Sequence, residues 1–256
     1  MQAETVFMTS KKEEIIICGL NAVLAQAKAC PGDLIKLLYI KERLDRLKPL
    51  LKKLAKEGIA YEEVASEKIE RVSKSTHHEG VALISRRKKI LYLSDIEKEI
   101  ISSKDYRCLY LGEIENPHNL GAIIRSAVHF SFLDIVIEND TAINASACCR
   151  TAEGGHAQVR IIKASWDQFS HFCEKNKINI VATAVNKGEN LFKINLPSKY
   201  VLMFGEEGEG LSGAKMKRAD NIVNIPGSSK IESMNVSCAA SVIFAEMFRK
   251  NYFEKP

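Results

Sequence analysis

From Tyr106 to the end of the chain, short apolar segments alternate with segments that have a helical pattern. The apolar segments are rich in Ile, Val and Leu and read, in order, RCLYLGEI, LDIVIE, AQVRIIKA, INIVATAV, YVLMFG and NIVNI. Helical patterns occur in NLGAIIRSAVHFS, in SWDQFSHFCEKN and from about residue 235 to 252. Apolar strands without polar alternation are typical of sheets buried on both faces, and parallel strands need crossover connections. The pattern therefore predicts an α/β domain over residues 106–256, with a mostly parallel sheet covered by helices on both faces.

The first 90 residues alternate in the same way on a smaller scale. CGLNAVLAQAKA has a helical pattern, LIKLLYI a strand pattern, and KERLDRLKPLLKKLAKEG the pattern of an amphipathic helix. The apolar face of that helix consists of Leu44, Leu47, Leu51 and Leu54. Gly58 is placed to end it, because glycine readily adopts the left-handed conformation of a C-terminal cap. We therefore expect a small N-terminal α/β domain over residues 1–90. The charged stretch that follows lacks clear periodicity at its start and predicts a linker over residues 91–105.

The composition is that of a globular protein, since 46% of the 256 residues are hydrophobic and 27% are charged. The formal net charge is +5, and the segment from Lys36 to Lys56 holds eight basic residues against two acidic ones. Such a run fits either a solvated helix face or a surface for a polyanion, and charge alone leaves both interpretations open.

The chain has seven cysteines and no C-x-x-C pair, which favours reduced, mostly buried thiols over disulfides. The first residues, MQAETVFMTSKKEE, are polar and acidic and lack the pattern of a signal peptide. The longest uncharged apolar stretch, Ile15–Ala27, is too short to span a bilayer. We therefore expect a soluble, cytoplasmic protein without a membrane partner.

The stretch YVLMFGEEGEGLSG contains the G-x-G-x-x-G spacing of dinucleotide-binding loops, from Gly208 to Gly213. That fingerprint belongs to the first strand–helix turn of a nucleotide-binding domain, whereas here it follows several strands. Glu206, Glu207 and Glu209 would also oppose a pyrophosphate, and no Gly-Lys-Ser/Thr follows. An NAD(P)-dependent oxidoreductase is therefore the weaker interpretation of this loop.

Two other segments place polar residues at helix starts. ENPHNLGAIIRSA contains Asn119 and Arg125, and Asn119 would suit the N-cap of the helix that follows. Ser233 and Asn235 precede the last helix. Small residues suited to close packing lie inside that helix, namely Ala239, Ala240 and Ser241. Taken singly, each segment fits a capped helix without a catalytic role.

Taken together, three segments resemble the three motifs of the SpoU/TrmH family of RNA ribose 2′-O-methyltransferases. They read Asn119-Leu120-Gly121 with Arg125, Phe204-Gly205-Glu206-Glu207-Gly208-Glu209-Gly210-Leu211-Ser212, and Ile225-Pro226 followed by Ser233-Met234-Asn235-Val236-Ser237. The match covers about residues 106–250, with further similarity in TAEGG and ATAVNKGENLF. The N-terminal segment, which closes on HHEGVALIS, is similar to the substrate-binding domain that precedes the catalytic domain in many members.

The resemblance implies a fold, a cofactor and partners. The C-terminal domain would be a trefoil-knotted α/β methyltransferase domain, and the N-terminal α/β domain would bind RNA. S-adenosylmethionine would lie in loops that contain Thr183, Gly205, Ile225 and Met234. The reaction would transfer its methyl group to a ribose 2′-oxygen of structured RNA, either ribosomal or transfer RNA, without a metal. The resemblance also implies a homodimer formed through the knotted domain.

The family match assigns the catalytic tasks to Asn119, Arg125, Glu207, Ser233 and Asn235. Because a guanidinium with a pKa above about 12 is a poor base, we expect Arg125 to hold the target phosphate and stabilise the nearby oxyanion. Glu207 and Asn119 would orient Arg125 and the loops. Ser233 and Asn235 would line the cofactor and the ribose.

One residue departs from the family pattern, because many relatives have a glycine where this chain has Ser229. If that position requires a positive φ, Ser229 is strained or Gly227 takes over the turn. The alternative to an enzyme is a non-catalytic RNA-binding protein on the same fold.

Overall fold

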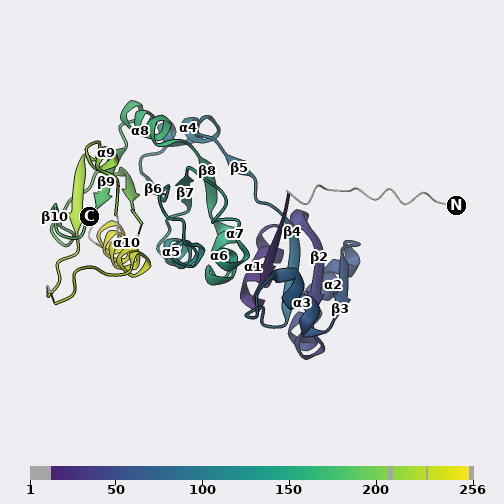
Figure 1. The fold of residues 1–256 in the computed structure, drawn as a ribbon. Coiled ribbons are helices and arrows are strands. Elements are labelled where there is room, and N and C mark those ends of the chain that lie inside the picture. Colours follow the sequence, from purple (N-terminus) through teal and green to yellow (C-terminus); the bar gives the residue numbers. More distant parts are fainter. Residues whose placement is uncertain (1–12, 207–209, 229, 254–256) are drawn as a thin grey trace. The chain divides into compact units, whose positions relative to one another are not determined.

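The computed structural model of the chain describes residues 13–206, 210–228 and 230–253 (Figure 1). Their contacts divide the chain into two compact units. Unit 1 runs to Lys88 and includes Asn144–Ala157, and unit 2 consists of Lys89–Ile143 and the chain from Gln158 onward.

Unit 1 is built on a four-stranded sheet in the order β1-β4-β2-β3. Its strands are β1 (Glu14–Cys18), β2 (Leu34–Tyr39), β3 (Ala60–Glu63) and β4 (Val81–Arg86). β4 pairs antiparallel with β1 and β2, whereas β2 pairs parallel with β3. Helices α1 (Leu20–Ala29) and α2 (Leu44–Lys56) contribute to the larger core, and α3 (Ser66–Ser73) packs on a smaller one. Alternate residues of β4 enter the two cores, so the helices cover both faces of this sheet. Helices α6 (Ser146–Thr151) and α7 (Gly155–Gln158) lie in the second segment of this unit, apart from the last residue of α7.

Helix α2 forms as its pattern predicts. Leu47, Leu51 and Leu54 are buried, while Leu44 is half-buried. Gly58 has φ +70°, and the amide of Ile59 donates to the carbonyl of Leu54 at 2.9 Å. This is the Schellman arrangement, in which a left-handed residue closes the helix. The predicted role of Gly58 is confirmed.

Unit 2 contains an eight-stranded sheet in the order β10-β12-β9-β11-β6-β7-β8-β5. The strands are β5 (Ile90–Leu91), β6 (Tyr106–Tyr110), β7 (Asp134–Ile137), β8 (Arg160–Lys163), β9 (Asn179–Thr183), β10 (Glu189–Asn190), β11 (Lys199–Met203) and β12 (Asn221–Asn224). Every described pair in this sheet is parallel. The predicted α/β domain with a mostly parallel sheet is confirmed.

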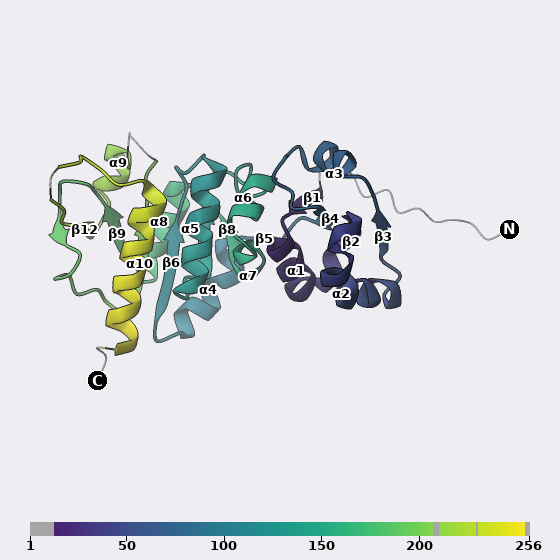
Figure 2. The same ribbon diagram turned by 90° about the horizontal axis from the view of Figure 1, so that it is seen from below.

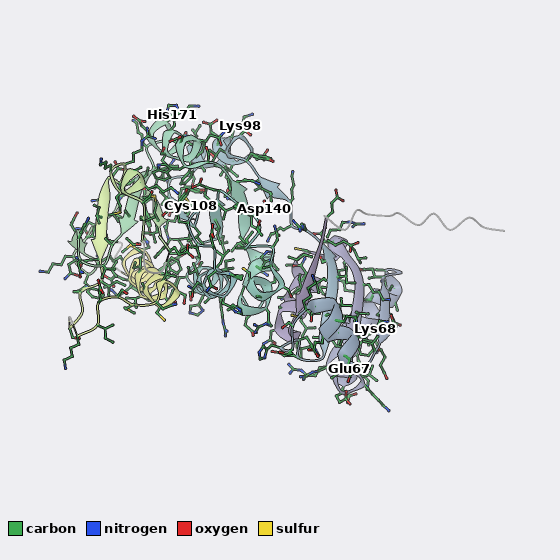
Figure 3. All side chains as sticks on the ribbon, in the orientation of Figure 1. Glu67, Lys68, Lys98, Cys108, Asp140 and His171 are labelled. Atoms are coloured by element: carbon green, nitrogen blue, oxygen red, sulfur yellow. The ribbon has the colours of Figure 1, made fainter. Side chains whose placement is uncertain are left out.

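Helices cover both faces of this sheet, as Figure 2 shows. They are α4 (Leu93–Ser102), α5 (Pro117–His129), α8 (Trp166–Lys175), α9 (Gly213–Met216) and α10 (Val236–Phe253). α4 and α8 share a core with one side of β6, from which Cys108, labelled in Figure 3, points inward. α5 and α10 lie side by side, and the hydroxyls of Ser126 and Ser241 are 2.8 Å apart. This contact confirms that the small residues of the last helix permit close packing.

The order of the last strands bears on the predicted knot. β12 lies between β9 and β10, which the short segment 184–188 joins directly. This link passes close to β12, because a Cβ on Gly188 would lie 2.2 Å from the carbonyl oxygen of Ile222. The trefoil knot requires a late segment to pass through an earlier loop, and the knot itself stays a prediction.

The predicted linker, residues 91–105, contains the whole of helix α4. Ile96 and Ile100 of this helix are almost fully buried in the core of unit 2. At its N-terminus the amide of Tyr92 donates to the side-chain carboxylate of Asp95 at 2.8 Å, and the amide of Asp95 donates to the carbonyl of Tyr92 at 2.9 Å. The charged residues that precede this helix obscure the helical spacing of its buried residues, Ile96 and Ile100.

Two further expectations concern the whole described chain. All seven cysteines are free, and all but Cys30 and Cys238 are buried. Within residues 13–206, 210–228 and 230–253, no helix is both long and apolar enough to cross a membrane.

Candidate active site

The loops that carry the predicted site meet at one edge of the unit 2 sheet. In the pairing register, Tyr110 lies beside Met203, Met203 beside Ala182, and Thr183 beside Val223. These residues end or nearly end their strands, and because the strands are parallel, their carboxyl ends share an edge. Ligands of open α/β sheets bind outside this edge, where the order of connections changes.

The loop after β11 comes into close contact with itself around Gly205. A Cβ at this position would lie 2.1 Å from the carbonyl carbon of Gly210 and 2.2 Å from the amide nitrogen of Leu211. The amide of Gly210 donates to the carbonyl of Glu206 at 2.9 Å, and Gly210 has φ +70°. Both positions therefore suit glycine, Gly205 because no side chain fits there and Gly210 because its φ is positive.

The other predicted cofactor residues lie on neighbouring strand ends. The hydroxyl of Thr183 donates to the carbonyl of Met203 at 2.9 Å, directly before the Gly205 loop. Ile225, directly after β12, is half-buried, whereas Met234 is 48% exposed. Ile231 in the same loop is 82% exposed. Exposed apolar side chains in the segment that follows β12 suit a flat, apolar ligand such as an adenine ring.

Asn119 does not cap the helix, so this expectation is wrong. Helix α5 begins at Pro117, and the side chain of Asn116 accepts from the amides of His118 at 2.9 Å and Asn119 at 3.4 Å. Proline at the first helical position needs no partner for its nitrogen. Asn119 lies in the first turn, where its side chain is available for a tertiary contact.

That tertiary contact joins two of the predicted catalytic residues. The Asn235 side-chain nitrogen donates to the side-chain oxygen of Asn119 at 3.1 Å. The Asn235 oxygen accepts from the amide of Ser237 at 2.9 Å and from its hydroxyl at 2.6 Å. Asn235 therefore caps α10 and links its start to the start of α5.

Arg125 and Ser233, the other described residues of the predicted catalytic set, form no hydrogen bond with Asn119 or Asn235. Arg125 lies six residues beyond Asn119 on α5, is exposed, and has no hydrogen-bond or ion-pair partner among the described residues. Ser233 is exposed in the loop before α10. Glu207 and Ser229 fall outside the described residues, so their predicted roles stay predictions.

A buried charge cluster at this edge was not predicted from the sequence. Lys215 on α9 is only 8% exposed, and its ammonium contacts Glu138 at 2.7 Å and Glu113 at 3.0 Å. Tyr110 donates a hydrogen bond to Glu138. Burial opposes ionisation of Glu138, but the hydrogen bonds from Lys215 and Tyr110 hold its pKa below the usual range. Helix α9 has only four residues, which is too short for a periodic pattern to predict which of its residues are buried.

Family comparisons agree with this geometry. Residues 106–245 match the SpoU rRNA Methylase family, and residues 16–91 match the RNA 2′-O ribose methyltransferase substrate binding domain. The chain belongs to the SpoU rRNA Methylase family.

Curated relatives of this SpoU-family chain match nearly its whole length. The chain is 28% identical to the 23S rRNA (guanosine-2′-O-)-methyltransferase RlmB of Pasteurella multocida, over 91% of this chain and 97% of the relative. It is 29% identical to the uncharacterized tRNA/rRNA methyltransferase YfiF of Escherichia coli O157:H7, over 96% of this chain and 71% of the relative.

Solved structures share the fold of this SpoU chain. The AdoMet-bound rRNA methyltransferase from Sinorhizobium meliloti aligns with a TM-score of 0.77 at 20% identity, over 95% of this chain and 89% of that one. The SpoU methyltransferase AviRb from Streptomyces viridochromogenes, in complex with AdoMet, also gives 0.77 at 20% identity, over 94% and 92%.

The residues of the SpoU site suit S-adenosylmethionine. The turn at Gly205 has no room for a side chain, and the segment between β12 and α10 carries the apolar side chains of Ile225, Ile231 and Met234, which are half-buried or exposed. Within the described residues, no three His, Cys, Asp or Glu side chains gather as metal ligands.

Proposed function

We propose that this protein methylates a ribose 2′-hydroxyl of ribosomal RNA, with S-adenosylmethionine as the methyl donor. The observation that carries the proposal is that the three motif segments lie at the carboxyl edge of the unit 2 sheet. The Asn119–Asn235 hydrogen bond joins the first and third motifs, and the second motif contains the Gly205 turn. This chain matches both family models and aligns with 97% of the RlmB relative, which is named as a 23S rRNA methyltransferase. This similarity favours ribosomal RNA over transfer RNA as the substrate.

The cofactor supplies a methyl group on a sulfonium, which is already activated for transfer to an oxygen nucleophile. The task of the chain is therefore to position the reactants and to help the hydroxyl lose its proton. Thr183, Gly205, Ile225 and Met234 would hold the methyl donor, chiefly through main-chain groups and apolar contact.

Arg125 is the residue best placed to hold RNA, because its guanidinium is exposed and unpaired among the described residues. A guanidinium binds phosphate with two parallel hydrogen bonds, and its fixed charge stabilises an oxyanion that develops nearby. Ser233 and Asn235 would lie on the ribose side, and Glu207 would orient the loops.

The basic run of unit 1 supports a second RNA contact. Within it, Lys36 pairs with Glu62 at 2.7 Å and Lys48 pairs with Asp45 at 2.6 Å. Four exposed basic side chains in the run have no partner among the described residues, namely Lys41, Arg46, Lys52 and Lys56. Unpaired cations of this kind bind phosphates without selecting a sequence. We propose residues 1–90 as the RNA-binding domain.

A homodimer through unit 2 is also part of the proposal. Rings cluster where α5 and α10 end, with Phe130 and Phe248 5.8 Å apart and Phe248 stacked on Tyr252 at 4.2 Å. Tyr252 is 55% exposed and Phe253 is 77% exposed. A second copy would cover this apolar surface. Sedimentation as a monomer at micromolar concentration would contradict the dimer.

The deciding experiment maps 2′-O-methyl positions in ribosomal and transfer RNA from cells with and without this protein. We expect one ribosomal position to lose its methyl group in the deletion strain, and purified protein with S-adenosylmethionine to restore it. Loss at a transfer RNA position would name the other substrate. No lost position, together with no uptake of S-adenosylmethionine in calorimetry, would favour the non-catalytic RNA-binding protein.

A further inference from the structure

Lys215 lies immediately after the loop that carries the second motif, in a part of the chain to which the proposed reaction assigns no role. Helix α9 begins at Gly213, so only Ser212 and the helix start separate Lys215 from Gly210 and Leu211. The side chain is 10% exposed, although lysine is among the residues that proteins most rarely bury.

The Lys215 ammonium joins three loops at the carboxyl edge of the sheet. It contacts Glu113, in the loop after β6, at 3.0 Å, and Glu138, directly after β7, at 2.7 Å. Glu113 also accepts a hydrogen bond from the amide of Ser212 at 3.3 Å, in the loop after β11. Asp140, which is labelled in Figure 3, marks the position of the loop after β7 to which Glu138 belongs.

Aromatic rings complete the surroundings of this ammonium. It lies 5.1 Å from the centre of the Tyr110 ring and 5.9 Å from that of Trp166. Ring faces attract cations, and Tyr110 also donates to the Glu138 carboxylate. We call Tyr110, Glu113, Glu138 and Lys215 the lysine cluster.

The lysine cluster places one cation between two carboxylates. Without the ammonium, the two carboxylates would repel one another, and Glu138 would lose its ion pair with Lys215. A helix of four residues has little stability of its own. The position of α9, and with it the end of the second-motif loop, therefore depends on the contacts of Lys215.

We propose that Lys215 is a positioning residue that fixes the second-motif loop against the loop leading into α5. It thereby sets the spacing between the Gly205 turn and Asn119 at the start of α5. The anchoring of the loop by Lys215 does not depend on the proposed function. The expected consequence, a change in affinity for the methyl donor, rests on the proposed function.

The anchoring is tested by hydrogen exchange on the full chain without added ligand. Lys215→Met removes the charge at similar length, and Lys217→Met is the control, since Lys217 is exposed two residues away. We expect exchange in residues 111–116 and 210–216 to become at least about tenfold faster in Lys215→Met and to stay unchanged in Lys217→Met. Exchange within about twofold of wild type in both segments would overturn the proposal.

The functional consequence is tested by calorimetry with S-adenosylmethionine. We expect Lys215→Met to raise Kd about tenfold or more and to leave the affinity for RNA unchanged, whereas a purely structural role would lower thermal stability alone. Adding Glu138→Gln removes the uncompensated carboxylate and should recover part of the loss. If Lys215→Met does not fold, this double variant decides the question by the same exchange measurement. If wild-type protein takes up no S-adenosylmethionine, the proposed function fails, while the exchange result still decides the anchoring.

Discussion

Replacing Gly205 by alanine tests whether the second-motif loop is built as the structure shows. The three atoms nearest to a Cβ at this position are all backbone atoms, at 2.1, 2.2 and 2.4 Å. They belong to Gly210 and Leu211. Gly205 is not among the glycines with positive φ, so the expected effect comes from space and not from backbone strain.

The magnitude follows from the contact distances. Carbon atoms in contact lie about 3.5–4.0 Å apart, so the Gly210 backbone would have to retreat by roughly 1.4 Å. Overpacking of this kind costs about 1–3 kcal/mol, and rigid backbone neighbours favour the upper end. If the whole cost falls on the bound state, about 3 kcal/mol corresponds to roughly a hundredfold weaker binding of S-adenosylmethionine. A displacement of about 1 Å is also enough to lower turnover by about a hundredfold.

The assay is calorimetric titration with S-adenosylmethionine, with thermal unfolding as a check on the fold. Gly227→Ala is the matched control, because Gly227 also lies in a predicted cofactor loop, has no positive φ, and has nothing within 4 Å of its Cβ position. We expect the control to bind within about threefold of wild type, since an added methyl group in open space causes no clash.

The reasoning would be refuted by a folded Gly205→Ala protein that binds S-adenosylmethionine as tightly as Gly227→Ala does. That result would mean that the close approach of Gly205 and Gly210 is not a feature of the binding-competent loop.

Four other perturbations test separate parts of the protein. Asn235→Ala should lower the free energy of unfolding by about 1 kcal/mol, as for other N-caps, whereas Asn235→Ser keeps a capping oxygen and should lose less in chemical denaturation. Arg125→Lys should reduce turnover on RNA by about tenfold or more, because lysine cannot form the paired hydrogen bonds to phosphate, with unchanged calorimetric affinity for S-adenosylmethionine; near-full turnover of Arg125→Ala would contradict the phosphate role. The folded-state pKa of Glu138 lies below its ordinary value of about 4.5, so its stabilising contribution is full above that pH and is lost as pH falls through the lowered pKa. Denaturation curves between pH 7 and 3 should therefore show a smaller acid loss for Glu138→Gln than for wild type. Lys52→Ala with Lys56→Ala should reduce the salt dependence of RNA binding, and an unchanged slope would exclude this surface.

Much of the fold could be predicted because the determining signals are local. In the apolar strand segments of unit 2 and on the leucine face of α2, the residue types themselves indicate which positions are buried. The elements that they pack against need not be known. Gly58 could be assigned for the same reason, since a left-handed cap depends on the residue itself. Helix α4 was missed as an element because its charged flank hides its short apolar period.

The order of the three motifs along the chain allowed part of the candidate site to be predicted. Thr183, Gly205 and Ile225 lie at adjacent strand ends, as parallel strands require. The capping assignment failed at Asn119, because Asn116 and Pro117 together begin the helix earlier. Asn116 and Asn119 are three residues apart, and residue preference alone cannot decide which of them caps the helix.

The sequence by itself determined that this chain forms a parallel α/β unit preceded by a smaller one, and that it carries the SpoU motifs in order. Only the tertiary structure decided that β12 lies between β9 and β10, that Asn119 bonds with Asn235, and that Lys215 is buried against two carboxylates. The physical reason is the range of the interactions. Helix and strand periods arise from neighbouring residues, whereas strand order and buried ion pairs depend on segments that only folding brings together.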